Sequence, residues 1–290
     1  MSVVIITGSN SGLGLSAALA FARNGDTVYA TMRDTGKATQ LLDAAGDADV
    51  HVKALDVTRP ETFAALVDSV VAEAGRIDVL VNNAGLLRAG SLEDVTEEQL
   101  RLVVETNLMG PLLLSRAVLP QMRVQNSGCI IMMSSLSGIA GLPGDVPYTA
   151  SKFGLEGATE ALRHEVDRWG IRVALVEPGM YATQIFDSAL AGGDVLPADY
   201  PGDSPYRVFV ESRLKGVLDR APEAFDPGPV GELLVEIAAS DGSRLRWPAD
   251  AVAEKVLATM FAHDDAQRDA FLREVGGSEW WSKGEEKCPD

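Results

Sequence analysis

VVIITGSNSGLG, residues 3–14, joins an apolar run to a glycine-rich turn, and the helical stretch LSAALAFAR follows at once. Three glycines, Gly8, Gly12 and Gly14, therefore stand between a predicted strand and a predicted helix. Glycine is needed in such a turn where the backbone takes positive φ or where another group comes close to it. At the start of a βαβ unit, the turn and the amino end of the helix are suited to bind phosphate.

Apolar runs alternate with helical stretches in the first two thirds of the chain. After the opening run, strands are predicted in TVYATM, HVKALDV, DVLVNN, CIIMMS and RVALVEP. Helices are predicted at residues 13–23, 37–45, 61–74, 96–123 and 148–169. Near-continuous apolar strands separated by helices are typical of a parallel sheet covered on both faces. The sequence therefore predicts an α/β protein with a single-domain, doubly wound Rossmann fold, in which helices flank a central parallel sheet.

Composition restricts the class of partner. The 290 residues carry a formal net charge of −17, which argues against nucleic acid or an acidic membrane surface as a partner. No run approaches the roughly 18 apolar residues of a membrane span, so we expect no membrane insertion and a soluble, cytoplasmic protein. Isolated thiols and histidines without metal-ligand spacing predict no metal site; these are Cys129, Cys288, His51, His164 and His263.

The glycine-rich turn predicts a dinucleotide ligand. Gly8 would permit the tight turn, Gly12 the approach of a pyrophosphate, and Gly14 the close packing of helix on strand. We expect the intervening residues to contact the same ligand, with polar groups for phosphate; these are Ser9, Asn10, Ser11 and Leu13.

The end of the second strand predicts which dinucleotide binds. A carboxylate there would bind the ribose hydroxyls of NAD, whereas an arginine accommodates the extra phosphate of NADP. The sequence reads ATMRD, so Met32 stands where the carboxylate is expected, with Arg33 beside it. Asp34 follows directly, and its carboxylate leaves NAD as a second possible cofactor. We therefore predict that NADP(H) is preferred and that NAD(H) is possible.

The remaining motifs occur in a characteristic order. They are TGSNSGLG, NNAG at 82–85, Asn107 in NLMG, Ser135, YTASK at 148–152 and PGMYAT at 178–183. This set resembles the short-chain dehydrogenases/reductases. Within that family, ATMRD and SLSGIAGLPGDVPYTASKFGLEG resemble the 17β-hydroxysteroid dehydrogenase type 1 group and its retinol dehydrogenase relatives.

The resemblance implies an NAD(P)-dependent oxidoreductase that interconverts a secondary alcohol and a ketone. It implies a catalytic tetrad of Asn107, Ser135, Tyr148 and Lys152, with Asn107 positioning a water in the proton relay and Lys152 also holding the ribose. It further implies cofactor contacts from Asp56, Val57, Asn83, Ala84, Gly85, Tyr148, Pro178, Gly179 and Thr183, and a homodimer or homotetramer packed through the two long helices.

The chemistry of the tetrad can also be argued from the residues. Tyr148 and Lys152 are four apart on a predicted helix and project from one face. A free tyrosine has a pKa of about 10, and we expect the nearby ammonium, with the positive ring of the oxidised cofactor, to lower the pKa of Tyr148. Tyr148 could then exchange a proton with the substrate oxygen, which Ser135 would hold by a hydrogen bond.

The regular alternation of strands and helices ends after Pro178. Helices are predicted at 206–218, 230–239 and 249–263, with a short strand near 243–247. We predict one domain over 1–290, in which 1–183 form the cofactor-binding and catalytic core, 184–228 a substrate loop or lid, and 229–290 a C-terminal helical extension. Ser135, Leu142, Tyr148, Met180 and Tyr181 are the predicted substrate-binding residues, and Leu86, Leu87, Ile139, Ile185 and Phe186 are further candidates for an apolar lining.

Three functions remain open at this stage. An apolar lining favours a lipophilic alcohol or ketone such as a steroid or retinoid. Basic residues facing Tyr148 from the loop would instead favour a small polar, sugar or 3-oxoacyl substrate. A non-catalytic NADP-sensing protein is the third candidate, although a binding protein has no use for a complete proton relay.

Overall fold

The computed structural model describes residues 1–185 and 192–288, and in these seven strands form one parallel sheet. The strand order is β3-β2-β1-β4-β5-β6-β7. The bounds are β1 Val3–Thr7, β2 Thr27–Met32, β3 Val50–Ala54, β4 Val79–Asn82, β5 Gly128–Met133, β6 Ile171–Glu177 and β7 Arg246–Pro248. The prediction of a doubly wound α/β fold is confirmed.

The strand order reverses between β1 and β4, at the centre of the sheet. Val4 of β1 pairs with Val28 on one side and with Val79 on the other. Every residue of β1, β2, β4 and β5 is buried, which explains their continuous apolar sequences. In open α/β sheets, a crevice forms beyond the carboxyl ends of the strands at such a reversal, and ligands bind there.

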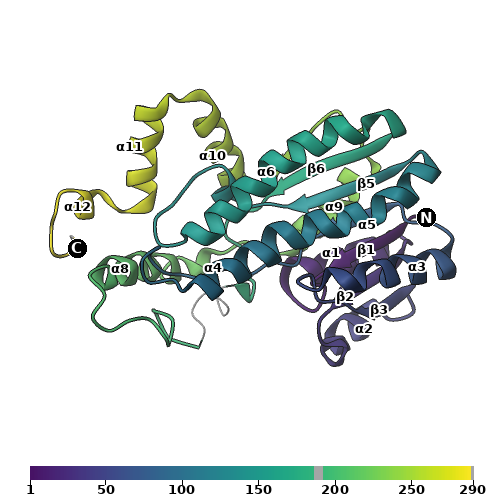
Figure 1. The fold of residues 1–290 in the computed structure, drawn as a ribbon, viewed down its shortest axis with the longest axis horizontal. Helices are drawn as coiled ribbons and strands as arrows, with labels where there is room; N and C mark the ends of the chain where they lie inside the picture. The colour runs from purple at the N-terminus through teal and green to yellow at the C-terminus, as the bar shows by residue number, and fades with distance from the viewer. Residues whose placement is uncertain (186–191, 289–290) are drawn as a thin grey trace.

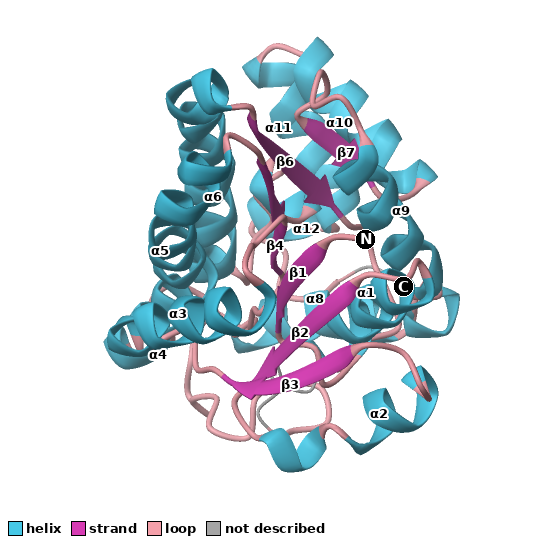
Figure 2. Cartoon of the chain, turned by 90° about the vertical axis from the view of Figure 1, so that its right-hand side faces the viewer, coloured by secondary structure: helices cyan, strands magenta, loops and turns pink. Residues whose placement is uncertain are grey.

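Helices cover both faces of the sheet (Figure 2). One layer holds α1 Gly12–Arg23, α2 Thr39–Ala45 and α9 Gly228–Ala239, and the other holds α3 Phe63–Ala74, α5 Gly110–Gln125 and α6 Val146–Val166. The core is accordingly split into two apolar clusters, one on each face. α9 approaches α1 closely, because a Cβ on Gly231 would lie 2.6 Å from the carbonyl oxygen of Ser16.

The predicted helix over 96–123 contains an irregularity that its sequence pattern does not reveal. α4 Glu97–Val104 passes through a π-helical turn, η3 Glu105–Met109, before α5 begins. Contrary to the sequence expectation, the combined stretch Glu97–Gln125 is long and apolar enough to cross a membrane by length and composition. Three of its side chains, Leu114, Val118 and Met122, are fully buried against the sheet, as in the core helix of a globular domain.

The C-terminal third adds more structure than predicted. The expected helices correspond to α8 Arg207–Leu218, α9 and α10 Ala251–Ala262, and the short strand is β7, which extends the sheet beside β6. Two helices whose bounds were not predicted, α11 Asp265–Gly276 and α12 Glu279–Ser282, form the yellow arm in Figure 1. A capping box between Asp264 and Gln267 starts α11, and that D-x-x-Q spacing was a usable sequence signal.

Candidate active site

The glycine-rich turn lies at the carboxyl end of β1, as predicted. Gly8 and Gly12 adopt positive φ values of 69° and 54°, conformations that favour glycine. A Cβ on Gly14 would lie 2.2 Å from the carbonyl oxygen of Gly8 and 2.4 Å from Nδ2 of Asn83. The first two glycines thus shape the turn, and the third lets α1 pack directly on it.

Two further loops meet this turn at the strand reversal. Nδ2 of Asn83, after β4, donates to the carbonyl of Thr7 at 2.8 Å, and the backbone N–H of Ala84 donates to Oγ1 of Thr7 at 2.9 Å. Thr183, after β6, has its Cγ2 3.0 Å from the position that a Cβ on Gly12 would take. The structure therefore brings together three segments that the sequence predicted to line one dinucleotide.

Some polar residues of the turn are hydrogen-bonded within the protein, and others are available to bind a ligand. Ser9 is fully buried, its N–H donates to the carbonyl of Thr31 and its hydroxyl to that of Ile6, so the expectation that Ser9 offers its hydroxyl to phosphate is not supported. Ser11 is the extended N-cap of α1 and makes no side-chain cap hydrogen bond, while Asn10 contacts Ser11 weakly at 3.5 Å. Leu13 packs against the core on the α1 face.

The end of β2 separates the two candidate nucleotide-selecting residues. The carboxylate of Asp34 accepts a hydrogen bond from the N–H of Gly36 at 2.9 Å. Asp34 is thereby the N-cap of the short helix η1 Thr35–Lys37. Arg33 is exposed and close to Asp56. Partial burial raises the pKa of Asp56, but hydrogen bonds from Thr58 and the charges of Arg33 and Arg59 outweigh it, so the pKa stays below its ordinary value.

The predicted neighbours Val57, Gly85 and Pro178 also lie around this edge. A Cβ on Gly110, at the start of α5, would lie 2.7 Å from the carbonyl oxygen of Val57, which fixes that loop against the helix. A Cβ on Gly85 would lie 4.0 Å from Nζ of Lys152. Pro178 directly follows β6 and is buried. A glycine cradle, a free helix amino end and an exposed arginine suit the pyrophosphate and the 2′-phosphate of a dinucleotide.

The tetrad residues Tyr148 and Lys152 lie close together on α6. Nζ of Lys152 is 5.6 Å from the centroid of the Tyr148 ring and donates to the carbonyl of Met133 at 2.7 Å. Ser135, the N-cap of the short helix η4 Leu136–Gly138, has its hydroxyl within hydrogen-bonding reach of the Tyr148 phenol. Both Tyr148 and Lys152 are buried, with exposed fractions of 6% and 5%.

The protein's own groups raise the pKa of Tyr148, whereas the sequence expectation relied on Lys152 together with the positive ring of the oxidised cofactor to lower it. Burial raises the pKa of Tyr148 to about 12; Ser135 opposes the shift and the charge of Asp145 adds to it. Burial also lowers the pKa of Lys152 to about 8, although Glu156 acts to raise it. Desolvation disfavours the charged form of each group, and the sequence rule that placed a cation beside the phenol took no account of it.

Asn107 lies within the π-helical turn, a distortion that often marks functional sites. Its Oδ1 accepts from the N–H of Leu86 at 2.9 Å, and its Nδ2 donates to the carbonyl of Leu86 at 2.8 Å and to Oγ of Ser151 at 3.1 Å. The amide thus ties the loop after β4 to the helix that carries Tyr148. Ser151 was not predicted, although it stands inside the YTASK motif.

A second residue missed from sequence is Asp250, the N-cap of α10. Its Oδ2 accepts from the N–H of Gly179 at 2.9 Å, and its Oδ1 accepts from the N–H of Ala253. A Cβ on Gly179 would lie 2.9 Å from the same carboxylate. Asp250 therefore holds the loop after β6 in place, and only its position before a helical stretch could have suggested a capping role.

The predicted substrate residues do not all face the same space. Tyr181 is buried in the core cluster beneath α1 and α9, and its hydroxyl donates to the carbonyl of Ala249 at 3.0 Å. Ile139 is buried against α10. These two are therefore core residues. Leu142, Met180, Leu86, Leu87 and Ile185 are only half-buried, and Phe186 falls outside the described residues.

The described part of the predicted lid is tied down by polar contacts. The carboxylate of Asp94 accepts from the hydroxyls of Tyr200 and Ser204, the latter at 2.7 Å. Nη2 of Arg88 forms a 2.8 Å ion pair with Asp199. The C-terminal arm covers the lid from outside, because Trp281 stacks on the Phe209 ring of α8.

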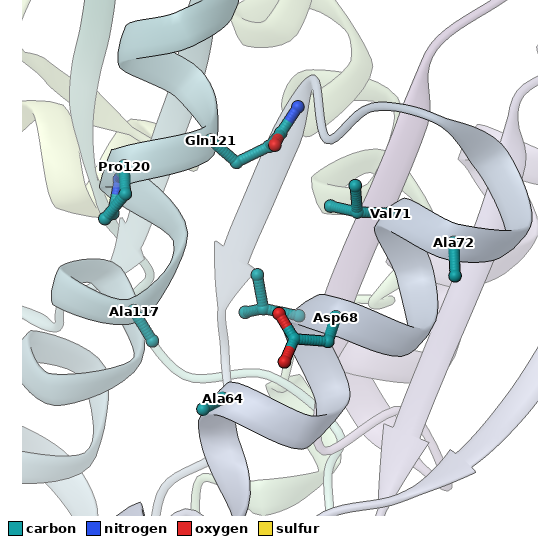
Figure 3. A pocket seen from close by; sticks show the side chains of 8 residues that line it. Ala64, Asp68, Val71, Ala72, Ala117, Pro120 and Gln121 are labelled. Carbon is teal, nitrogen blue, oxygen red and sulfur yellow. The ribbon is translucent and has the colours of Figure 1, made fainter.

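A groove of about 490 Å³ lies between α3 and α5 (Figure 3), far from these residues. Ala64, Val71, Ala117 and Pro120 line it, with Asp68, Val67, Ala72 and Gln121. Gln125, one turn beyond Gln121, hydrogen-bonds to Ile77 just before β4, so this groove lies towards the amino ends of the strands. The catalytic groups lie at the carboxyl ends.

Comparison with known proteins agrees with this site. A family model described as short chain dehydrogenase matches residues 2–192. "Uncharacterized oxidoreductase YusZ" of Bacillus subtilis is 39% identical over 85% of this chain and 88% of its own length. "17-beta-hydroxysteroid dehydrogenase type 1" of Mus musculus is 33% identical over 85% of this chain and 73% of its own.

A solved structure extends the similarity to the whole fold. The crystal structure of a short-chain dehydrogenase from Streptomyces avermitilis matches with a TM-score of 0.77 and 32% identity, over 98% of this chain and 97% of its own. The family model covers well over half of the sequence, including the glycine turn and the catalytic helix. The chain therefore belongs to the short-chain dehydrogenase family and is an NAD(P)-dependent oxidoreductase.

Proposed function

We propose that this protein is an NADP(H)-preferring reductase that interconverts a secondary alcohol and a ketone on a lipophilic substrate, in the manner of the hydroxysteroid dehydrogenases. One observation carries the reaction class: the Tyr148 phenol, the Ser135 hydroxyl and the Lys152 ammonium lie together, next to Gly85 in the loop that packs on the glycine turn. The steroid-like substrate class rests on the likeness to 17-beta-hydroxysteroid dehydrogenase type 1.

The protein's own groups divide the proton chemistry among them. When bound, the nicotinamide supplies or accepts the hydride. Ser135 holds the substrate oxygen through Oγ, and Tyr148 exchanges a proton with that oxygen through its phenol. Because burial raises the pKa of Tyr148 to about 12, the phenol is protonated at neutral pH and ready to donate to a carbonyl. This protonation state is the one that ketone reduction requires of its proton donor.

The reaction is expected to depend on pH through Lys152. Its pKa is lowered to about 8 by burial, so the ammonium is present below that pH and lost above it. Without the cation, the phenolate left by proton donation is less stable. We expect kcat for ketone reduction to be flat from about pH 6 to 7.5 and to fall about tenfold per unit above the Lys152 pKa. A profile flat to pH 10 would contradict this role of Lys152.

NADP(H) preference is proposed from the end of β2, where Asp34 is used as a helix cap and Arg33 is exposed. We expect Arg33→Ala to raise the KM for NADPH about 10- to 100-fold, because a charge-assisted hydrogen bond contributes about 1.5–3 kcal/mol. The KM for NADH should change less than about twofold. Equal losses for both nucleotides would refute the assignment.

Arg59→Ala is the matched control for this measurement. Arg59 is also close to Asp56, but its Nε is paired with Glu61 at 2.9 Å. Removing it should therefore leave both nucleotide KM values near those of the unaltered protein.

Support for a lipophilic substrate comes from apolar residues close in sequence to the catalytic motifs, among them Leu142 and Met180, which are half-buried. A small polar, sugar or 3-oxoacyl substrate would be supported by an arginine in the lid whose guanidinium is available to bind an acidic group. Arg213 of α8 is close to Asp145, but it donates to the carbonyls of Gly276 at 2.7 Å and Pro143 at 3.4 Å. These contacts give the polar alternative no added support.

The substrate class is tested by following NADPH absorbance with steroids, retinoids, aryl ketones, sugars and 3-oxoacyl thioesters. Turnover of the first three groups and not of the last two is the expected result. Turnover restricted to sugars or thioesters would favour the polar alternative. NADPH binding without turnover of any compound would favour a sensor.

A homodimer or homotetramer is proposed through the helices that carry the site. Apolar side chains are exposed along them: Leu102 on α4, Met109 in η3 and Phe153 on α6, with exposed fractions from 36% to 47%. Exposed apolar surface of this kind is typical of subunit interfaces. Sedimentation analysis would determine the number of subunits.

A further inference from the structure

Two buried carboxyl groups, one on the catalytic helix α6 and one at the end of β6, have no part in the chemistry above. Glu177 ends β6 and is fully buried, and Glu156 lies on α6, one turn beyond Lys152, with 4% exposed. Within the described residues, Oε1 of Glu156 and both carboxylate oxygens of Glu177 are buried without a hydrogen bond of good geometry. The Ser134 hydroxyl beside Glu156 and the backbone N–H of Trp247 beside Glu177 act to lower the two pKa values, but burial outweighs them. An ionised carboxylate in such a place is strongly disfavoured unless it is paired.

A single arginine faces both carboxyl groups. Nε of Arg246, on β7, lies 2.9 Å from Oε2 of Glu156 and 4.0 Å from Oε1 of Glu177. Its Nη1 lies 3.4 Å from Oε1 of Glu160, whose side chain is 56% exposed. One guanidinium can neutralise one buried carboxylate, and Glu160 has water to solvate it. The two buried carboxyl groups therefore share Arg246 as their ion-pair partner.

The surroundings leave little room for the pair to rearrange. A Cβ on Gly138 would lie 2.6 Å from Oγ of Ser134 and 3.0 Å from Cγ of Glu156, so the η4 turn packs directly on this cluster. The charged groups that act on the pair are Lys152 and Glu160 from α6, and Arg244 and Arg246 from the β7 segment. Burial raises the pKa of Glu177 to about 8; Glu156 adds to the shift, and Arg246 opposes it.

We propose that Glu156 and Glu177 are positioning residues that together carry one proton at neutral pH, and that this state, neutral overall with Arg246, holds the Lys152 turn of α6 against the Pro178–Gly179 turn. Glu177 directly precedes Pro178, and Glu156 follows Lys152 by one helical turn. The link to nucleotide affinity rests on the function proposed above. At alkaline pH the proton passes to water, and the second buried negative charge destabilises the contact between the two turns.

The first test needs neither nucleotide nor substrate. In the unfolded chain a glutamate has a pKa of about 4.3, whereas that of Glu177 is raised to about 8 in the fold. The folded state then binds an extra proton between these values, so stability falls as pH rises through them. We expect the Tm of the unaltered protein to fall about 5–10 °C more than that of Glu177→Gln between pH 6 and 8.

Glu160→Gln is the matched control, because Glu160 faces the same arginine from the solvent side and should leave the pH dependence of Tm unchanged. Infrared spectroscopy supplies a direct signature: a protonated-carboxyl C=O band at pH 7 that disappears at pH 10 and in Glu177→Gln. Glu156→Gln is a second variant. In it, Glu177 is the remaining buried carboxyl group beside Arg246, so Glu177 should be ionised and the protonated-carboxyl band should also be lost. Parallel Tm curves for Glu177→Gln and the unaltered protein, or a band that persists in both variants, would overturn the proposal.

A second test connects the pair to the nucleotide site. The KM for NADPH should rise more steeply between pH 7 and 9 in the unaltered protein than in Glu177→Gln, where only the loss of the Lys152 charge contributes, while the alkaline fall in kcat that we assign to Lys152 remains in both. An identical rise in KM in both proteins would refute the positioning role. If no substrate is turned over, the Tm and infrared measurements still decide whether the pair holds a proton, so the two proposals fail separately.

Discussion

Replacing Tyr148 by phenylalanine is expected to lower kcat about 10²- to 10⁴-fold, because it removes the phenol that we propose exchanges a proton with the substrate oxygen. Tyr148 is 6% exposed and lies beside Ser135 and Lys152, so the phenyl ring should keep the same position. The measurement is NADPH oxidation at saturating ketone. The dissociation constant for NADPH, measured by fluorescence, should change less than about threefold.

Two outcomes would contradict this role of Tyr148. Loss of less than tenfold in kcat would mean that another group or water supplies the proton. A large loss of NADPH affinity with unchanged kcat would make Tyr148 a binding residue. Since the phenol is buried, Tm should be compared in both proteins, so that unfolding is not mistaken for lost catalysis.

Replacing Gly14 by alanine is expected to weaken NADPH binding at least about tenfold and to lower the free energy of unfolding by about 1–3 kcal/mol. The added Cβ would lie 2.2 Å from the backbone oxygen of Gly8 and 2.4 Å from Nδ2 of Asn83. Neither atom can move away easily, because the first belongs to the backbone and the second is hydrogen-bonded to the carbonyl of Thr7. The start of α1 must therefore move away from the turn that it supports. Denaturant unfolding and NADPH titration measure the two effects.

Gly216→Ala is the control for this substitution. Gly216 lies on the exposed side of α8, and a Cβ there would meet no atom within 4 Å. Alanine in place of an exposed helical glycine should raise the free energy of unfolding by about 0.5–1 kcal/mol. Equal behaviour of the two variants would show that the close approach at Gly14 does not matter.

The sequence predicted which residues form the site better than it predicted their burial and its effect on their pKa values. Tyr148, Lys152, Ser135 and Asn107 were chosen from motif spacing, and the fold brings them to the carboxyl edge of the sheet around α6. The sequence did not reveal that burial raises the pKa of Tyr148, because this effect depends on how much water the fold excludes from the phenol. Such burial arises from segments distant in sequence, which a local pattern does not contain.

Tyr181 and Ser9 show the same limit at the level of single side chains. Both were assigned to binding from their neighbours in the sequence, yet Tyr181 donates to Ala249 in the core and Ser9 donates to Ile6 beneath the turn. A side chain's direction after a strand end depends on the local backbone, and one residue of difference reverses the face that it presents. The division of the chain into core, lid and extension stays a prediction.

The sequence alone determined the parallel sheet, the glycine turn and the family, because strand hydrophobicity, helix periodicity and glycine requirements are local properties. Only the tertiary structure decided which charges are buried together. Glu156, Glu177 and Arg246 come from three different elements, and their proximity depends on α6 and β7 packing against β6. The energy of a buried charge depends on its partners in space, and those partners lie up to 90 residues apart in the chain.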